Sequence, residues 1–318
     1  MAFLSRDYGT LRIRLSQAAI AAAPMIFVFV WSTGFIGAKY GLPYIEPFTF
    51  LAVRMALVVL LHLLIVWLAR VPWPNASETR HSVVTGLLVH GLYLGGVFVA
   101  ISQGVPAGIS ALIPGLQPLL TSTIASRWLG EKVNALQWFG LALGLAGVAL
   151  VLHDRTLVGS GTLLGWCASF ISLLGIALGT LYQKRHGGTI DWRSGNLVQY
   201  AAAGVLFALG ALTFETRLIH WSGELVFALA WLVLVMSLGA VWLMYWLIRR
   251  SAATGFASLF YLVPVVTALM AYVLFNEKLD PLSIAGMVVC AAGVVMVNRG
   301  AARVRPAAGN AAASVTGD

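Results

Sequence analysis

Ten apolar runs, each close to the roughly 20 residues that an α-helix needs to cross a bilayer, follow one another along this chain. Only 10% of the residues are charged, against roughly 25% in soluble domains. Because a bilayer offers no partner to free backbone groups, such runs must cross it as helices. The chain is therefore predicted to be an all-α polytopic membrane protein. The expected spans lie near 18–38, 47–69, 81–103, 107–128, 134–152, 160–183, 195–214, 224–248, 253–275 and 280–298.

One stretch of the chain occurs twice. AGISALIPGLQPLLTSTIASRWLGEK at 107–132 returns 146 residues later as ATGFASLFYLVPVVTALMAYVLFNEK at 253–278. Continued through the next apolar run, the copies share 14 identities in 46 positions, including a proline within the helix and a closing Glu-Lys. Chance likeness between apolar helices favours Leu, Val and Ala, so we interpret the match as a duplication. A unit of five helices reverses its second copy, which predicts ten transmembrane helices as two inverted five-helix repeats.

The duplication also sets the expected domain boundaries. An N-terminal segment at 1–17 precedes the first repeat at 18–152, and the second repeat at 160–298 precedes a disordered tail at 299–318. With both termini on one side, that side receives 15 of the 20 Lys and Arg residues, and the other side receives four. Positive residues accumulate on the cytoplasmic side of membrane proteins. Both termini are therefore predicted to be cytoplasmic.

Several classes of site are not expected. The basic residues are scattered between apolar runs, so the net charge of +9 predicts no nucleic-acid partner. Cys167 and Cys290 lie within apolar runs, which predicts packing residues and neither a disulfide framework nor a metal site or cofactor. Gly140-x3-Gly144 and Gly286-x3-Cys290 predict close approach of the fifth and tenth helices.

Two other functional classes were weighed against transport. An intramembrane enzyme acting on lipid would need a nucleophile, a base or a metal cluster at membrane depth. A channel would need a polar or charged pore, and a non-transporting scaffold would need no particular chemistry. Neither class requires an inverted repeat, whereas secondary transporters are commonly built from one. We therefore expect a transporter and not an enzyme.

Three groups of residues resemble the EamA-type ten-helix members of the drug/metabolite transporter superfamily. They are WSTGFIGAKYG at 31–41, Arg54 in FLAVRMAL, and the twin blocks described above. The match covers nearly the whole chain between its tails. This resemblance implies a bacterial inner (cell) membrane protein that exports small metabolites, amino acids or drugs by alternating access, through a cavity between helices 1–4 and 6–9. The implied partners are a small-molecule substrate and the lipid bilayer. The sequence leaves undecided whether the protein forms a homodimer.

The candidate cavity residues are the polar, aromatic and helix-bending residues of the spans. They are Trp31, Gly34, Arg54, His90, Tyr93, Gln117, Pro118, Trp242, Tyr245, Tyr261 and Pro264. Proline removes a backbone donor, so Pro118 and Pro264 predict kinks that serve either a substrate path or packing alone. The aromatic residues can form a wall for an amphipathic substrate or simply fill the core.

Arg54 is the clearest charge inside a span. Because a charge at this depth is costly, the guanidinium is expected to face the bundle interior or water. A substrate carboxylate would be its best partner, while the structural alternatives are backbone carbonyls, Glu46 or water. The spans contain no Asp or Glu, so transport without ion coupling is one alternative. If a proton moves with the substrate, His90 is the candidate carrier.

Overall fold

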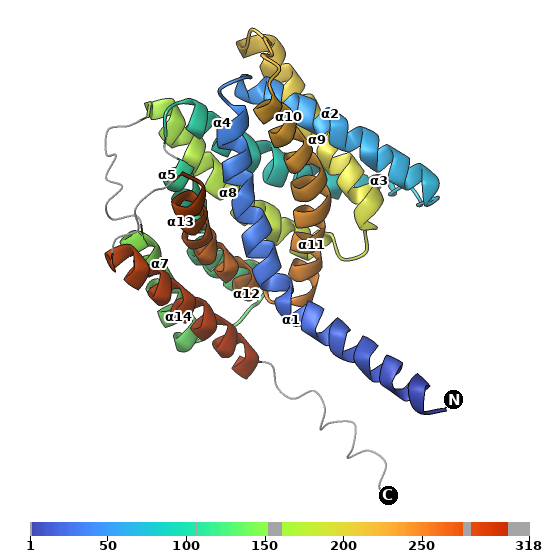
Figure 1. The fold of residues 1–318 in the computed structure, drawn as a ribbon, viewed down its shortest axis with the longest axis vertical. Coiled ribbons are helices and arrows are strands. Elements are labelled where there is room, and N and C mark those ends of the chain that lie inside the picture. Colours follow the sequence, from blue (N-terminus) through green and yellow to red (C-terminus); the bar gives the residue numbers. More distant parts are fainter. Residues whose placement is uncertain (1, 106, 152–160, 276–280, 305–318) are drawn as a thin grey trace, which may run out of the picture.

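The computed structural model describes residues 2–105, 107–151, 161–275 and 281–304, and these ranges are almost entirely helical (Figure 1). The helices are α1 (Ala2–Gly41), α2 (Pro47–Leu68), α3 (Ala76–Thr85), η1 (Gly86–Leu94), α4 (Gly95–Ser102), α5 (Ala107–Gly115), α6 (Gln117–Trp128), α7 (Ala135–Val151), α8 (Leu163–His186), α9 (Trp192–Phe214), α10 (Gly223–Ala230), η2 (Trp231–Ala240), α11 (Val241–Arg250), α12 (Ala253–Ser258), η3 (Leu259–Tyr261), α13 (Leu262–Phe275) and α14 (Pro281–Val304). The described residues form no strand beyond an isolated bridge between Ile45 and Ile219.

The helices account for the ten predicted spans. Eight continuous helical segments of the described chain are long and apolar enough to cross a bilayer. The fourth span is divided into α5 and α6, and the fifth is the shorter apolar helix α7. Two ends differ from expectation, because α1 begins at Ala2 and α14 continues to Val304, into the segment predicted as a tail. The rest of that tail lies outside the described residues.

We call the face where α2, α6, α8 and α11 end the terminal face, because α1 begins and α14 ends there. The side where α1 ends is the opposite face.

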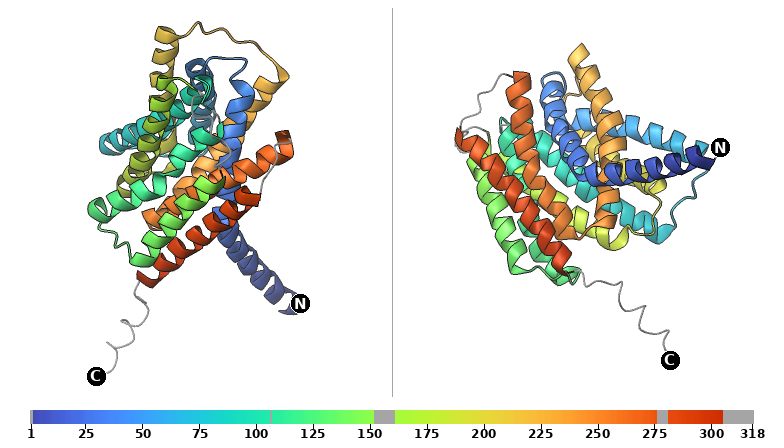
Figure 2. Two further views of the ribbon diagram at one scale, coloured as in Figure 1. Left: turned by 90° about the vertical axis from the view of Figure 1, so that its left-hand side faces the viewer. Right: turned by 60° about the horizontal axis from the view of Figure 1, so that its bottom comes forward.

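The fifth and tenth helices, α7 and α14, pack side by side, and Figure 2 shows the pair from two directions. Gly147 and Gly293 are equivalent positions of the two repeats. Neither has a side chain, so the two helices can approach each other closely. A Cβ on Gly147 would lie 2.5 Å from the Cys290 nitrogen, and one on Gly293 would lie 2.6 Å from the Gly144 nitrogen. Gly144 and Cys290 are themselves equivalent, so the two contacts are one contact repeated by a pseudo-two-fold axis.

This pair confirms the predicted close approach of the two helices. It also confirms Cys290 as a buried packing residue, whose Sγ lies 3.5 Å from the Gly144 oxygen. The same prediction is wrong for Cys167, because that side chain is exposed on the surface of the bundle.

Two glutamates, one from each repeat, hold the helix N-termini of the other repeat. At the terminal face Glu131 accepts the backbone N–H groups of Ala253 at 2.7 Å and Thr254 at 3.3 Å. At the opposite face Glu215 accepts those of Phe48 at 2.7 Å and Thr49 at 2.6 Å. The first N–H groups of a helix lack intrahelical partners and lie at its positive end, so a carboxylate satisfies both needs. The repeats are thus tied together at both faces.

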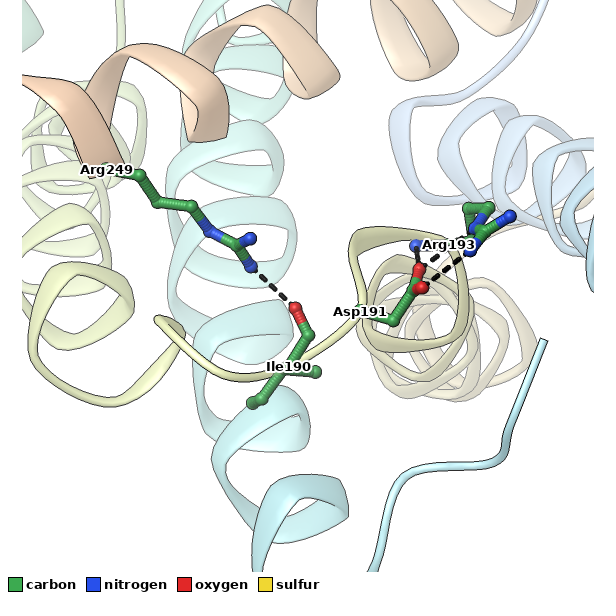
Figure 3. Close-up of polar contacts among 4 residues, drawn as sticks. All are labelled: Ile190, Asp191, Arg193 and Arg249. Carbon is green, nitrogen blue, oxygen red and sulfur yellow. Dashed lines mark hydrogen bonds and ion pairs between the residues drawn. The ribbon is translucent and has the colours of Figure 1, made fainter.

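The loop between α8 and α9 is fixed to the end of α11 at the terminal face (Figure 3). Arg249 Nη2 donates to the carbonyl oxygens of Gly187 at 2.7 Å and Ile190 at 2.6 Å. Asp191 then caps α9 and forms an ion pair with Arg193 at 2.7 Å. The hydrogen bonds from Arg193 lower the pKa of the Asp191 carboxyl below its ordinary value.

Both repeats interrupt their helices at matching positions. The fourth span breaks at Leu116, just before Pro118, and the ninth passes through the 3₁₀ turn η3 just before Pro264, so the predicted kinks are present. The third and eighth spans each contain a π-helical segment, η1 beginning at Gly86 and η2 beginning at Trp231. These starts are 145 residues apart, one residue fewer than the spacing of the twin blocks. π-helical turns are rare and occur frequently at functional sites.

Candidate substrate pocket

A pocket lies in the middle of the bundle, where the two π-helical segments face α1 and α2. Five of the predicted cavity residues meet there: Trp31, Gly34, Arg54, His90 and Tyr93. The remaining lining residues are Phe35, Val89, Leu94, Val97, Phe98, Met236 and Val241. The free volume is about 30 Å³, which is room for about one water molecule. The pocket is therefore contracted, and a larger molecule requires its walls to move apart.

The Arg54 side chain is the one charged group of the pocket lining, and only 4% of its surface is exposed. Its Nε and Nη2 both donate to the hydroxyl of Ser237, at 3.2 and 3.0 Å. Ser237 in turn donates to the Leu232 carbonyl at 3.0 Å, which fixes the hydroxyl. The Arg54 guanidinium carries five N–H donors, and it forms no ion pair with a carboxylate of the described residues.

Glu46 was one predicted partner of Arg54, and the structure places it elsewhere. Its carboxylate accepts from the Thr216 hydroxyl at 2.7 Å and from the Arg217 nitrogen at 2.9 Å, at the opposite face. Ser237, the observed partner, was missed by the sequence analysis. It carries the only hydroxyl group of η2, and its isolation within the apolar run WLVLVMSLGA was the signal that could have pointed to it.

Aromatic rings build the wall beside Arg54. The Trp31 Nε1 donates to the Tyr93 hydroxyl at 3.1 Å, and the two rings stack with their centroids 6.0 Å apart. Phe260 meets the Trp31 ring edge-on at 5.7 Å. The indole is thereby held in one orientation, and the Trp31 and Tyr93 rings both line the pocket. Such rings suit apolar groups and, through the ring quadrupole, ammonium groups.

His90 lies next to Arg54 and against the Tyr200 ring, with the centroids 4.4 Å apart. Its Nε2 is buried and has no hydrogen-bond partner among the described residues. A proton on His90 would add a second positive charge beside Arg54. In a site of low dielectric this repulsion opposes protonation unless an anion is also present.

The other candidates do not line this pocket. Gln117 is buried and donates from Nε2 to the Thr180 hydroxyl at 3.1 Å, with Pro118 next to it in the first turn of α6. Tyr261 is buried against Gly144, and Pro264 lies near Gly115.

Two candidates of α11 also lie outside the pocket. Tyr245 is buried and donates to Gln199 Oε1 at 2.5 Å, while Trp242 is 40% exposed on the surface of the bundle. Among the described residues no group of three or more His, Cys, Asp or Glu side chains gathers to hold a metal.

The chain matches the EamA-like transporter family twice, at residues 18–153 and 163–299, once for each repeat. It is 27% identical over 289 residues to the uncharacterized transporter YvbV of Bacillus subtilis, covering 90% of this chain and 93% of the relative. It is 29% identical to the uncharacterized inner membrane transporter YedA of Escherichia coli K12, covering 85% and 88%. It is 24% identical to a probable amino-acid metabolite efflux pump of the same strain, covering 85% and 91%.

A crystal structure similar to this one covers 92% of this chain, and 99% of its own chain is matched, with a TM-score of 0.73 at 19% identity. This likeness concerns the fold. The two family matches cover one repeat each, and α7 and α14 are the last helices of the two matched regions. The chain therefore belongs to the EamA-like transporter family.

Proposed function

We propose that this protein exports small carboxylate-bearing molecules by alternating access and that Arg54 binds the carboxylate. The observation that carries the proposal is the guanidinium itself, which is buried in the central pocket and has, among the described residues, a single hydroxyl as its side-chain partner. A buried cation without a counter-charge is costly. A carboxylate from the substrate supplies that charge and accepts two parallel hydrogen bonds.

The substrate class follows from the rest of the lining. The Trp31 and Tyr93 rings line the pocket, and aromatic rings suit an apolar group or an ammonium group. A molecule that has both a carboxylate and such a group can contact Arg54 and the aromatic rings at the same time. Two relatives, from Escherichia coli and Salmonella typhimurium, carry the name probable amino-acid metabolite efflux pump, which supports amino acids and their derivatives as the first substrates to test.

The direction and the membrane are part of the proposal. The excess of Lys and Arg beside the terminal face supports a cytoplasmic position for that face and for both termini. The relative YedA is named as an inner membrane transporter, which supports a bacterial inner membrane.

Alternating access requires the contracted pocket to open towards one face at a time. A groove of about 540 Å³ lies between α1, α10, η2 and α13, reaching from Thr33 and Trp231 to Tyr40 and Gly223 near the opposite face. Met236 lines the pocket, and its sulfur lies 3.8 Å from the hydroxyl of Thr33, which lines the groove. A shift of this flexible side chain would join the groove to the pocket. We assign the groove as the exit towards the opposite face.

The test is Arg54→Lys, which keeps the charge but loses the planar fork. Proteoliposomes are loaded with labelled tryptophan, glutamate or leucine, and with tetraphenylphosphonium as a cation that has no carboxylate. Loss of one charge-assisted hydrogen bond is worth roughly 1.4 kcal/mol or more, so we expect at least a roughly tenfold loss of affinity for amino acids. Transport of the cation should change much less.

The matched control is Arg193→Lys, since Arg193 is paired with Asp191 at the terminal face, far from the pocket. Its transport should equal that of the wild type at the same amount of folded protein. An equal loss for amino acids and for tetraphenylphosphonium in Arg54→Lys would make Arg54 structural. Failure of the wild type to move any carboxylate would refute the proposed function.

A further inference from the structure

A seam of buried polar side chains runs from the pocket towards the terminal face, between α3 and η1 on one side and α9 on the other. The backbones touch here, because a Cβ on Gly86 would lie 2.4 Å from the Gln199 oxygen. Nearer the terminal face, a Cβ on Gly195 would lie 3.6 Å from the Ser82 hydroxyl. Since α3 and α9 both begin at the terminal face, Ser82 and Asn196 mark the end of the seam that is near this face.

The α2 helix closes the third side of the seam. The ring of His62 lies 5.2 Å from the Tyr200 ring, and the His90 ring lies 4.4 Å from the same ring. Tyr200 donates to the Ser237 carbonyl at 2.6 Å, and Ser237 holds Arg54. The seam therefore ends at the pocket.

Five polar atoms along the seam have no hydrogen-bond partner within the described ranges. They are Ser82 Oγ, both amide atoms of Asn196, His62 Nε2 and His90 Nε2. Each of these four residues is at most 3% exposed. An unpaired buried polar atom costs roughly 1–3 kcal/mol, so an amide with neither atom paired requires a small molecule that both donates and accepts. Water is the molecule that meets this need in protein interiors.

We propose that this seam holds a file of water that carries protons between the terminal face and His90. The geometry of His62 supports a proton step. Its Nδ1 lies 3.1 Å from the Val58 carbonyl, which can only accept, so Nδ1 keeps its hydrogen and the lone pair of Nε2 remains available. A hydronium in the file gives one proton to Nε2 and becomes water, and release is the reverse. No other bond forms or breaks.

The surroundings of His90 tie this proton to the substrate, a step that rests on the proposed function. The ionisable groups facing His90 are Arg54 and His62 of α2, Tyr93 of η1 and Tyr200 of α9. In their described residues, α1 and η2 add no ionisable group to the lining, and α8 packs against η1 through Gly175 and Gly179. A carboxylate on Arg54 cancels the nearby positive charge and favours the proton on His90.

This coupling is reciprocal, so the proton equally favours the carboxylate. One carboxylate and one proton are therefore expected to cross together.

The first experiment detects the water without using transport. Hydroxyl radicals produced by a short X-ray pulse oxidise side chains that are in contact with bound water. Tyr200 is only 1% exposed, yet it should be labelled in the wild type because the file passes its ring. Asn196→Leu removes the amide and should abolish most of this labelling, and Ser82→Ala is the second variant if Asn196→Leu does not fold.

Thr121→Val is the matched control, because Thr121 Oγ1 is also buried and unpaired but lies on α6. It should leave the labelling of Tyr200 unchanged. An unlabelled Tyr200 in the wild type would refute the water file. So would equal labelling of Tyr200 in Asn196→Leu, Ser82→Ala and the wild type.

The second experiment counts protons in proteoliposomes that contain a pH-sensitive dye, with labelled tryptophan as the probe. One proton should accompany each tryptophan, and Asn196→Leu should slow this flux more than it slows tryptophan exchange at equal pH. If tryptophan moves in an Arg54-dependent way without protons, the path is refuted and the proposed function stands. If Tyr200 is labelled but the wild type carries no carboxylate, the proposed function falls and the water file stands.

Discussion

Replacing Gly147 by alanine tests the axis on which the two repeats are built. The new Cβ would lie 2.5 Å from the Cys290 nitrogen and 2.7 Å from the Gly286 oxygen. Ordinary contacts at such positions begin at 3.4 Å, so the first contact is short by 3.4 − 2.5 = 0.9 Å. Both neighbours are backbone atoms, and relief requires α7 and α14 to separate. Overpacking of this kind destabilises by roughly 1–3 kcal/mol.

The control is Gly239→Ala, because a Cβ there meets nothing within 4 Å. Alanine is favoured over glycine inside a helix by roughly 1 kcal/mol, and both variants receive this gain. Their difference therefore isolates the overpacking. Thermal unfolding of the purified protein in detergent should place Gly147→Ala below Gly239→Ala.

Gly293→Ala should lower the unfolding temperature by an amount similar to Gly147→Ala, since its Cβ would lie 2.6 Å from the Gly144 nitrogen in the equivalent contact. Equal unfolding temperatures for Gly147→Ala and Gly239→Ala would show that α7 and α14 are not held at this distance. A large effect of Gly147→Ala with none from Gly293→Ala would refute the pseudo-two-fold axis.

Three further outcomes are expected. Glu131→Gln keeps the shape of the cap on α12, but it removes the charge and leaves one acceptor oxygen for the N–H groups of Ala253 and Thr254, which should lower stability by about 1 kcal/mol. An unfolding temperature equal to that of the wild type would contradict this role. Asp191→Asn should lower the unfolding temperature at neutral pH. Since Arg193 holds the pKa of Asp191 below its ordinary 3.8, the difference is fully present above that value and should vanish as the pH falls through the lowered pKa, whereas a difference that is independent of pH would exclude this ion pair as its source. Trp242→Leu should transport at the wild-type rate because the indole is 40% exposed outside the pocket, and a selective loss of amino-acid transport would place it on the substrate path.

The amino-acid sequence by itself determined the class, the number of spans and the duplication. These properties depend on consecutive residues, because a bilayer-spanning helix requires an unbroken apolar run. A repeat with an odd number of helices also reverses its second copy in the membrane. The glycines of α7 and α14 and the prolines of the kinked spans were also predictable, since their effect on the backbone is local.

The tertiary structure alone decided which polar residues meet. Arg54 and Ser237 are separated by 183 residues, and no local pattern pairs them. The rotation of each helix about its axis is set by its neighbours, and a π-helical turn shifts the phase of every residue that follows it. Val241, directly after η2, therefore lines the pocket, while the adjacent Trp242 faces outward.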